Sequence, residues 1–173
     1  MKLVLLMIGL PVVLVAGVIG YAQWPAEPLP DGATADSVLV LKSERKLILL
    51  KEGKPVWTYR VALGGKPVGN KTEEGDERTP EGHYVIDYRN SKSAFHLALH
   101  VSYPNATDRA QATARGVSPG GLIMIHGTGK SMRVRSWQRR FLDWTDGCIA
   151  VTDKEIEQIW QAVPDGTPIE IRE

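Results

Sequence analysis

The feature that most constrains this chain is an uncharged stretch near its amino end, Leu3–Ala26. A helix of about 20 residues, rising about 1.5 Å per residue, spans a bilayer core of about 30 Å. This stretch is therefore expected to enter a membrane. Lys2 precedes it, whereas Glu27 and Asp31 follow it. The positive-inside rule then places the rest of the chain on the extracytoplasmic side.

The amino-terminal segment has two possible fates. Gly20-Tyr21-Ala22 gives only a weak small-x-small cleavage signal, and Pro11 interrupts the helical pattern. The segment is either removed as a signal peptide or retained as a membrane anchor, and we favour the anchor. Residues 1–23 are predicted to be this signal anchor or signal peptide, associated with the membrane. The remainder is expected on the extracytoplasmic side of that membrane.

A proline-rich spacer is predicted at residues 24–36. Three prolines and two acids fall within the nine residues Trp24–Gly32, a composition typical of an extended linker. Beyond it, residues 37–173 have the length of one globular domain. Residues 23–173 carry 20 basic and 20 acidic side chains. Because this balance lacks the positive field that a phosphate backbone requires, we expect no nucleic-acid partner.

Short apolar runs separated by turn residues predict strands in the first half of the domain. Apolar residues fill much of Val38–Leu41 and Lys46–Leu50, and Glu52-Gly53 follows as a turn. Apolar and polar side chains then alternate from Trp57 to Leu63. This is the pattern of a β-meander. The Gly-, Lys- and Glu-rich residues Gly64–Asp76 are predicted to form a loop.

Strands and short helices are mixed in the second half. Further strands are predicted at His83–Tyr88, Phe95–Val101, Leu122–Ile125, Gly147–Val151 and around Ile169 and Ile171. Short helices are predicted at Asp108–Arg115, at Val134–Trp144, and after Thr152, where Glu155 has capping-box spacing. The predicted fold class is mainly β: a compact mixed-strand barrel or sandwich with two or three short helices.

Cys148 is the only cysteine of the chain, so it cannot form an internal disulfide. It is an inert core thiol, an intermolecular bridge or a reactive nucleophile, and buried free cysteines are common. Gly147 removes a side chain beside the sulfur, which would let a substrate carbonyl approach. It would also leave backbone N–H groups to face a developing oxyanion.

His126 follows the apolar run that ends at Ile125. A lone histidine at such a strand end is commonly a structural residue. A cysteine nucleophile, however, needs a base or an imidazolium nearby to lower its thiol pKa from about 8.5. If the two residues act together, they must lie within hydrogen-bond reach, and the thiolate of Cys148 should persist well below pH 8.5.

Three motifs occur in a recognisable order. They are Arg78–Tyr84 (Arg-Thr-Pro-Glu-Gly-His-Tyr), Ile125-His126-Gly127 and Thr145–Ile149 (Thr-Asp-Gly-Cys-Ile). In these motifs the chain resembles the L,D-transpeptidase catalytic domains (YkuD type) of bacterial cell-wall enzymes, over residues 37–173. The form Trp-Thr-x-Gly-Cys-Ile-Ala-Val is similar to that of one branch, which includes members that hydrolyse peptides.

The resemblance implies roles for individual residues. Cys148 is the expected nucleophile and His126 the expected base, with the Gly127 carbonyl orienting the imidazole. The supporting residues of the predicted site are Gly127, Gly147, Thr145 and Asp146. The implied chemistry requires no metal and no organic cofactor.

The implied reaction is acyl transfer on peptidoglycan stem peptides during cell-wall biogenesis or remodelling. The implied location is the extracytoplasmic face of the bacterial cytoplasmic membrane, in the periplasm or cell wall. The donor would be a tetrapeptide stem, cleaved between the L-centre of a diamino acid and the following D-Ala. Cys148 would form a thioester that an amine resolves, with N–H groups around Gly147 and Cys148 holding the oxyanion. One alternative is an L,D-hydrolase that trims stems or releases a wall-bound lipoprotein. A further alternative is a non-catalytic wall-binding module.

Two positions depart from the family pattern. The usual motif has histidine directly before the glycine and arginine two residues after the cysteine, whereas this chain has Asp146 and Ala150. An anion therefore replaces an imidazole beside the nucleophile. The departure concerns the substrate pocket rather than the base.

His96 and His100 have the spacing of a helical metal pair, but they fall in a predicted strand. Four residues of a strand span about 13 Å, which is too far for one ion. We expect no metal at this pair.

Overall fold

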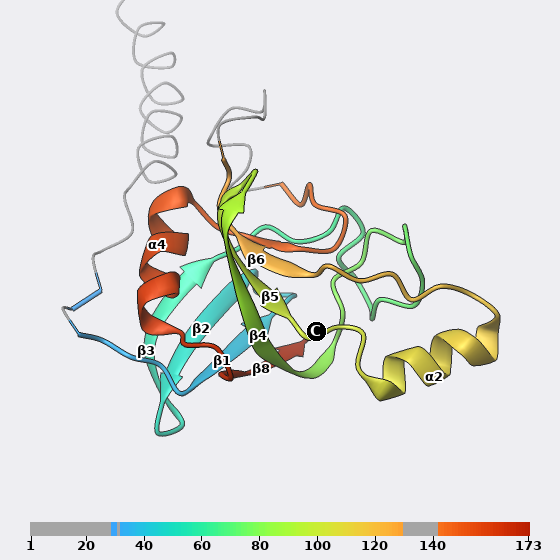
Figure 1. Cartoon of the computed structure of the whole chain (residues 1–173), viewed down its shortest axis with the longest axis horizontal. Coiled ribbons are helices and arrows are strands. Elements are labelled where there is room, and N and C mark those ends of the chain that lie inside the picture. The colour runs from blue at the N-terminus through green and yellow to red at the C-terminus, as the bar shows by residue number, and fades with distance from the viewer. Residues whose placement is uncertain (1–28, 31, 130–141) are drawn as a thin grey trace, which may run out of the picture.

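The computed structural model of the chain describes residues 29–30, 32–129 and 142–173. Within these ranges the main element is an eight-stranded sheet with the order β3-β2-β1-β8-β4-β5-β6-β7 (Figure 1). The strands are β1 (Ser37–Leu41), β2 (Lys46–Lys51), β3 (Lys54–Arg60), β4 (Gly82–Ser93), β5 (His96–Val101), β6 (Met124–His126), β7 (Ile149–Ala150) and β8 (Pro168–Arg172). Two helices accompany them in the described ranges: α2 (Ala106–Arg115) and α4 (Asp153–Ala162).

The first three strands form the predicted meander. β1 pairs antiparallel with β2, and β2 pairs antiparallel with β3. The turn between β2 and β3 consists of Glu52 and Gly53, whose φ angles of 52° and 71° are both positive. Type I′ hairpins require this backbone conformation. The alternation along β1 and β2 buries Val38, Val40 and Leu47, as the apolar pattern predicts.

The sheet closes on itself through a short seam. Ala62, which follows β3, forms an antiparallel bridge with Ala150 of β7. The Ala62 N–H donates to the Ala150 carbonyl at 2.9 Å, and the Ala150 N–H donates back at 2.8 Å. Gly64 forms a second, parallel bridge with Thr145. Since β3 and β7 are the two ends of the strand order, the result is a closed barrel of mixed parallel and antiparallel strands.

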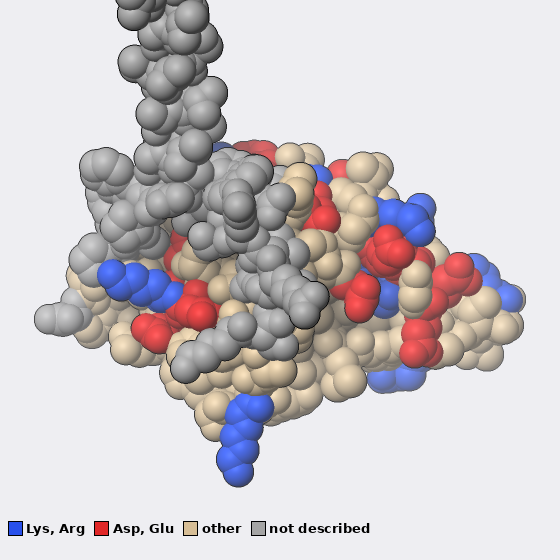
Figure 2. Space-filling model, turned by 90° about the horizontal axis from the view of Figure 1, so that it is seen from above, with Lys and Arg blue, Asp and Glu red and all other residues tan. Residues whose placement is uncertain are grey.

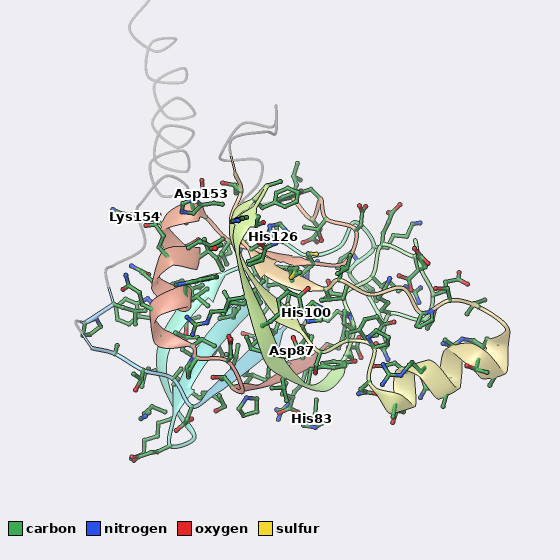
Figure 3. All side chains as sticks on the ribbon, in the orientation of Figure 1. His83, Asp87, His100, His126, Asp153 and Lys154 are labelled. Carbon is green, nitrogen blue, oxygen red and sulfur yellow. The ribbon has the colours of Figure 1, made fainter. Side chains whose placement is uncertain are left out.

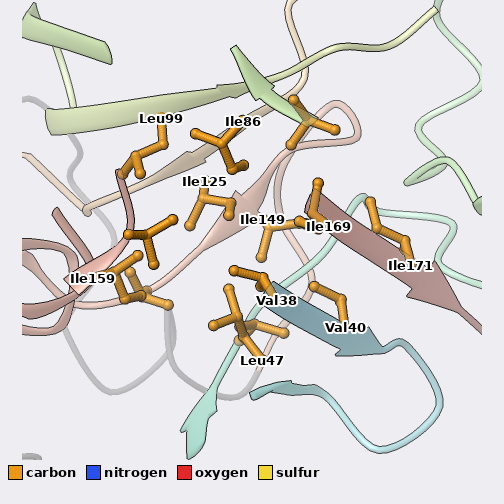
Figure 4. Packing of buried hydrophobic residues seen from close by; sticks show 14 of the residues in the cluster. Val38, Val40, Leu47, Ile86, Leu99, Ile125, Ile149, Ile159, Ile169 and Ile171 are labelled. Carbon is orange, nitrogen blue, oxygen red and sulfur yellow. The ribbon is translucent and has the colours of Figure 1, made fainter. Parts of the chain in front are cut away.

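Aliphatic side chains fill the inside of this barrel. Figure 4 shows members of the cluster that come from strands far apart in the sequence, together with one from α4: Val38, Val40, Leu47, Ile86, Leu99, Ile125, Ile149, Ile159, Ile169 and Ile171. Each of them is at most 1% exposed. Full burial of one such side chain is worth about 1.5–3 kcal/mol, so this cluster fixes the position of the short strands β6 and β7.

Both helices begin at capping boxes. Thr152 caps α4 through the Glu155 N–H, and the Glu155 carboxylate accepts from the Thr152 N–H in return, as predicted. Asn105 and Asp108 form the same arrangement at α2. The predicted start of that helix at Asp108 is therefore wrong by two residues, because Asp108 is the third helical residue rather than the first. Gly116 ends the helix in the left-handed conformation, as expected.

Two predicted strands are shorter than their apolar runs. Leu122 has a φ angle of 56° and is 70% exposed, so β6 begins only at Met124. β7 contains Ile149 and Ala150 alone. By contrast, the strand predicted at His83–Tyr88 continues to Ser93, past a bulge that breaks the alternation.

Three predictions concern residues that lie wholly or partly outside the described ranges. The membrane segment at residues 1–23 lies outside them, and so do residues 24–28 and 31 of the spacer predicted at residues 24–36. So does most of the helix predicted at Val134–Trp144, of which residues 142–144 are described and are not helical. In residues 29–30, 32–129 and 142–173, no helix combines the length and the apolar character needed to cross a membrane.

The carboxylate of Asp76 organises the loop that precedes β4. One of its oxygens accepts from the Lys71 ammonium at 2.8 Å and the Arg78 N–H at 3.1 Å. The other accepts from the N–H groups of Thr72 and Glu73 at 2.7 and 3.2 Å. Partial burial opposes ionisation, but these donors outweigh it and lower the pKa of Asp76 to about 2.

Asp76→Asn is expected to reduce the free energy of unfolding by about 1–2 kcal/mol at pH 7, after allowance for solvent screening. The folded pKa lies below the unfolded value of 3.8. The carboxylate therefore stabilises the fold fully above about pH 4, and this contribution is lost as the pH falls through 3.8 toward 2. Urea unfolding between pH 7 and pH 2.5 should show the difference between wild type and variant shrinking. An equal change in Glu44→Gln, at an exposed site, would contradict this explanation.

Candidate active site

The turn that carries the cysteine is held by the hydroxyl of Thr145. This hydroxyl donates to the Cys148 carbonyl at 2.7 Å and accepts from the Gly147 N–H at 3.2 Å. Gly147 has a φ angle of 126°, and a Cβ atom there would lie 2.5 Å from the Arg78 carbonyl oxygen. Only glycine fits this close approach, so the turn and the Arg78 backbone pack directly against each other.

Thr145→Val is expected to lower the free energy of unfolding by about 1–3 kcal/mol, because it leaves the buried Gly147 N–H without its acceptor. The turn would also shift, so we expect any turnover to fall at least about tenfold. Thermal unfolding and steady-state kinetics measure the two effects. Thr145→Ser keeps the hydroxyl and is the matched control. If valine and serine variants behave alike, the hydroxyl does not hold the turn.

Cys148 is a free, half-buried thiol directly before β7. Its sulfur lies 3.6 Å from the Leu122 carbonyl oxygen, to which the S–H donates. The Met124 N–H donates to the same sulfur. Both contacts come from the segment entering β6, and the positive φ of Leu122 belongs to that segment. The sulfur is thus held between two backbone groups.

His126 is almost completely buried, with 3% of its surface exposed. Its Nδ1 lies 2.6 Å from the Gly127 carbonyl oxygen. Because a carbonyl can only accept, Nδ1 carries the proton and Nε2 presents its lone pair. The ring packs against Phe95 with a centroid distance of 4.5 Å and meets Trp144 edge-on at 5.8 Å. These contacts fix the plane of the imidazole.

The strand register puts the two reactive side chains on one face. Ile125 pairs with Ile149, and His126 pairs with Ala150, in parallel strands. Ile125 and Ile149 point into the core, so alternation places His126 and Cys148 together on the other face. They occupy diagonal positions, about 8 Å apart along the backbone from standard strand spacings. The two side chains thus share a face, while their hydrogen bonds go to the backbone carbonyls of Gly127 and Leu122.

The electrostatics favour a neutral pair. Burial lowers the pKa of His126, and its hydrogen bond to Gly127 only partly offsets this. Burial raises the pKa of the Cys148 thiol; Asp146 raises it further, whereas the Met124 N–H and Lys71 lower it. This direction is opposite to the expected thiolate below pH 8.5. These directions favour a thiol and a neutral imidazole at rest. If Cys148 is the nucleophile and His126 its base, the proton would have to move during the attack.

The expected oxyanion donors also differ from the structure in part. The Gly147 N–H is bonded to Thr145, whereas it was expected to face the oxyanion together with the Cys148 N–H. Of the two groups, the Cys148 N–H remains the candidate donor. The contribution of Gly147 is the close approach to the Arg78 backbone.

Asp153, the first residue of α4, supports the segment that follows His126, a role that no sequence pattern predicted. Its Oδ1 accepts from the Thr128 N–H at 2.7 Å and from the Gly129 N–H at 2.9 Å. A Cβ atom on Gly127 would lie 2.6 Å from the same oxygen. These donors lower the pKa of Asp153 against the opposing effect of burial. Figure 3 shows Asp153 and His126 in the upper part of the view and His83 at the bottom.

Comparison with known proteins decides the family. The family model "YkuD: L,D-transpeptidase catalytic domain" matches residues 35–171. The chain belongs to this family. YafK from Escherichia coli K12, whose name assigns it provisionally to the L,D-transpeptidases, is 30% identical over 132 residues, or 73% of this chain and 46% of YafK.

Solved structures show the same fold. Pgp2 of Campylobacter jejuni, described as a helical cell shape determining protein, has a TM-score of 0.61 and 26% identity, covering 82% of this chain and 49% of Pgp2. Bd1075 of Bdellovibrio bacteriovorus has a TM-score of 0.57 and 23% identity, covering 87% of this chain and 52% of Bd1075. The chain spans about half the length of these relatives.

The L,D-transpeptidase fold puts the two departures from the family motif in different environments. Ala150 is buried at 3% exposure and takes part in the seam with Ala62, so its small side chain suits its place in the barrel wall. Asp146 is exposed at the tip of the turn. Within the described ranges, no three His, Cys, Asp or Glu side chains are grouped so as to hold a metal ion.

Proposed function

We propose that this chain is a cysteine-dependent L,D-transpeptidase that acts on tetrapeptide stems of peptidoglycan. The observation that carries the proposal is the hydrogen bond from His126 Nδ1 to the Gly127 carbonyl at 2.6 Å. It leaves Nε2 as a base on the sheet face that His126 shares with Cys148. Membership in the YkuD family and the likeness to Pgp2 support a function in the cell wall.

In the first half-reaction, His126 Nε2 takes the thiol proton as Cys148 Sγ bonds to the donor carbonyl carbon. This carbonyl belongs to the L-centre of the diamino acid. The carbonyl electron pair moves to oxygen, and the Cys148 N–H would stabilise the resulting oxyanion. When the oxyanion collapses, the C–N bond to D-Ala breaks and the imidazolium protonates the leaving amine. A thioester and free D-Ala result.

In the second half-reaction, an acceptor amine attacks the thioester and gives a proton to His126. The C–S bond breaks, and the sulfur recovers that proton from the imidazolium. One amide bond replaces another, so the reaction needs neither a metal nor an organic cofactor. If water replaces the amine, the same steps release a carboxylate, and the enzyme acts as an L,D-hydrolase.

The proposed division of the chain into segments is the one predicted from the sequence. Residues 37–173 form the catalytic domain, residues 24–36 a spacer, and residues 1–23 a signal anchor or signal peptide. The uncharged stretch Leu3–Ala26 supports a place outside the cytoplasmic membrane, where the stem peptides are.

The test is incubation of the full chain, in detergent, with purified muropeptides, with and without an amine acceptor. Mass analysis of the products identifies the reaction. A new amide to the acceptor supports the transpeptidase, and loss of D-Ala without acceptor incorporation shows a hydrolase instead. Unchanged muropeptides under both conditions would favour a wall-binding module and refute the proposed enzyme.

A further inference from the structure

The aspartates around the active site differ in whether the protein pairs them. Asp143 accepts from Arg45 at 2.8 Å, Asp76 accepts from Lys71, and Asp153 accepts from two backbone N–H groups. Acidic and basic side chains are interspersed in the same way over the face shown in Figure 2. Asp146 is the exception: among the residues that the structure describes, no hydrogen-bond or ion-pair partner meets its carboxylate.

The backbone that carries Asp146 is firmly fixed. Thr145 is buried, its hydroxyl bridges Gly147 and Cys148, and its own carbonyl accepts from the Gly65 N–H at 3.0 Å. Gly147 is packed on the Arg78 carbonyl. An exposed carboxylate is therefore held two residues from the nucleophile, on a turn with little freedom to move away.

This carboxylate acts electrostatically on the nucleophile. Asp146 raises the pKa of Cys148, and Lys71 lowers it. Lys71 is committed to Asp76 and to the Glu73 carbonyl, so its side chain is 3% exposed and fixed in place. Of these two charged groups, only the exposed carboxylate of Asp146 is therefore available to a ligand.

We infer that Asp146 is a specificity-determining residue that binds a primary ammonium group of the donor stem beside the scissile carbonyl. The inference rests on the proposed function, in which that carbonyl belongs to a diamino acid. The second centre of a diamino acid carries an amine that is protonated at neutral pH. An unpaired carboxylate two residues before the nucleophile, on the same fixed turn, is the complementary group.

Binding of the ammonium would also prepare the nucleophile. The cation would neutralise Asp146 and leave the influence of Lys71 unopposed. Loss of the thiol proton would then become easier only when a stem with a free amine is in place. Part of the binding free energy of the ammonium group would then lower the barrier to the step in which the thiol loses its proton and negative charge develops on the sulfur.

The first test needs no turnover. Cys148 is modified with two methanethiosulfonate reagents, one bearing a trimethylammonium group and one bearing a sulfonate. Asp146 should accelerate the cationic reagent and slow the anionic one, so Asp146→Asn should lower the ratio of their rate constants by about fivefold at low salt. Glu52→Gln removes an equal charge at the exposed β2–β3 turn and should leave the ratio unchanged. An unaltered ratio in Asp146→Asn overturns the inference.

The second test uses donor stems with the second-centre amine either free or acetylated. Wild type should prefer the free amine in kcat/KM by at least about tenfold, and Asp146→Asn should lose most of this preference. Equal preference in both proteins overturns the inference while leaving the proposed function standing. Failure of wild type to convert either stem overturns the proposed function, and the reagent ratio then decides alone whether Asp146 selects cations.

Discussion

Cys148→Ala is expected to abolish acyl transfer, lowering kcat/KM by at least about 10⁴-fold, because the thioester cannot form without the sulfur. The fold should persist, since a half-buried thiol directly before β7 contributes little packing, and the unfolding temperature should change by only a few degrees. The product assay and thermal unfolding measure these effects. A carbapenem, which the family resemblance suggests as an acylating agent, should add once to wild type and not to this variant.

The opposite pattern would identify an inert core thiol. In that case native wild type would remain unmodified in intact-protein mass spectra until it is denatured. The variant would then differ from wild type only in stability. Cys148→Ser is the matched control for volume, because it puts a hydroxyl of similar size in place of the thiol.

His126→Gln is expected to reduce kcat/KM by about 10²–10⁴-fold, the usual contribution of a positioned base. Wild type should also show a characteristic pH profile. The base must be neutral, and burial lowers its pKa below the ordinary 6.5. Activity should therefore be retained above pH 6.5 and lost as the pH falls through the lowered pKa.

The acid limb separates a base from a structural histidine. In His126→Gln the residual rate should lose that limb, because no imidazole at this position titrates. Steady-state rates between pH 4.5 and 9 measure it. If the limb stays at the same pH in the variant, another group acts as the base.

Local signals in the sequence were sufficient for much of the fold. Thr152 and Glu155 predict the start of α4 because a capping box needs only neighbouring residues. Glu52-Gly53 predicts the β2–β3 turn for the same reason. At Leu122 the apolar run is misleading, since a positive φ angle takes this residue out of the strand and exposes its side chain.

The closure of the barrel could not be predicted from local sequence signals. Ala62 and Ala150 meet in a single bridge. Both lie in segments predicted as strands, but the patterns of those segments do not indicate that the two pair with each other. Such a contact depends on the summed geometry of the intervening strands.

The candidate site was predictable where a motif carries the chemistry. Cys148, His126 and Gly127 were named from the sequence, and their catalytic roles remain predictions. The supports of His126 were missed: Phe95 lies at the tip of the β4–β5 hairpin, and Asp153 looks like an ordinary acid at the start of a helix. Their contacts arise only when the chain folds.

The seam has a consequence for how the proposed enzyme could adapt to different substrates. β7 contains two residues, with β6 on one side and Ala62 on the other, and Cys148 directly precedes it. The sulfur is therefore attached to the wall of the barrel and shares its low mobility, unlike a nucleophile on a swinging loop. If the proposed function holds, tolerance for stems of different shape would come from the segments beside the wall. Substrate range and the position of the attacking sulfur would then depend on separate parts of the chain, so that mutations could change the first while the second is kept.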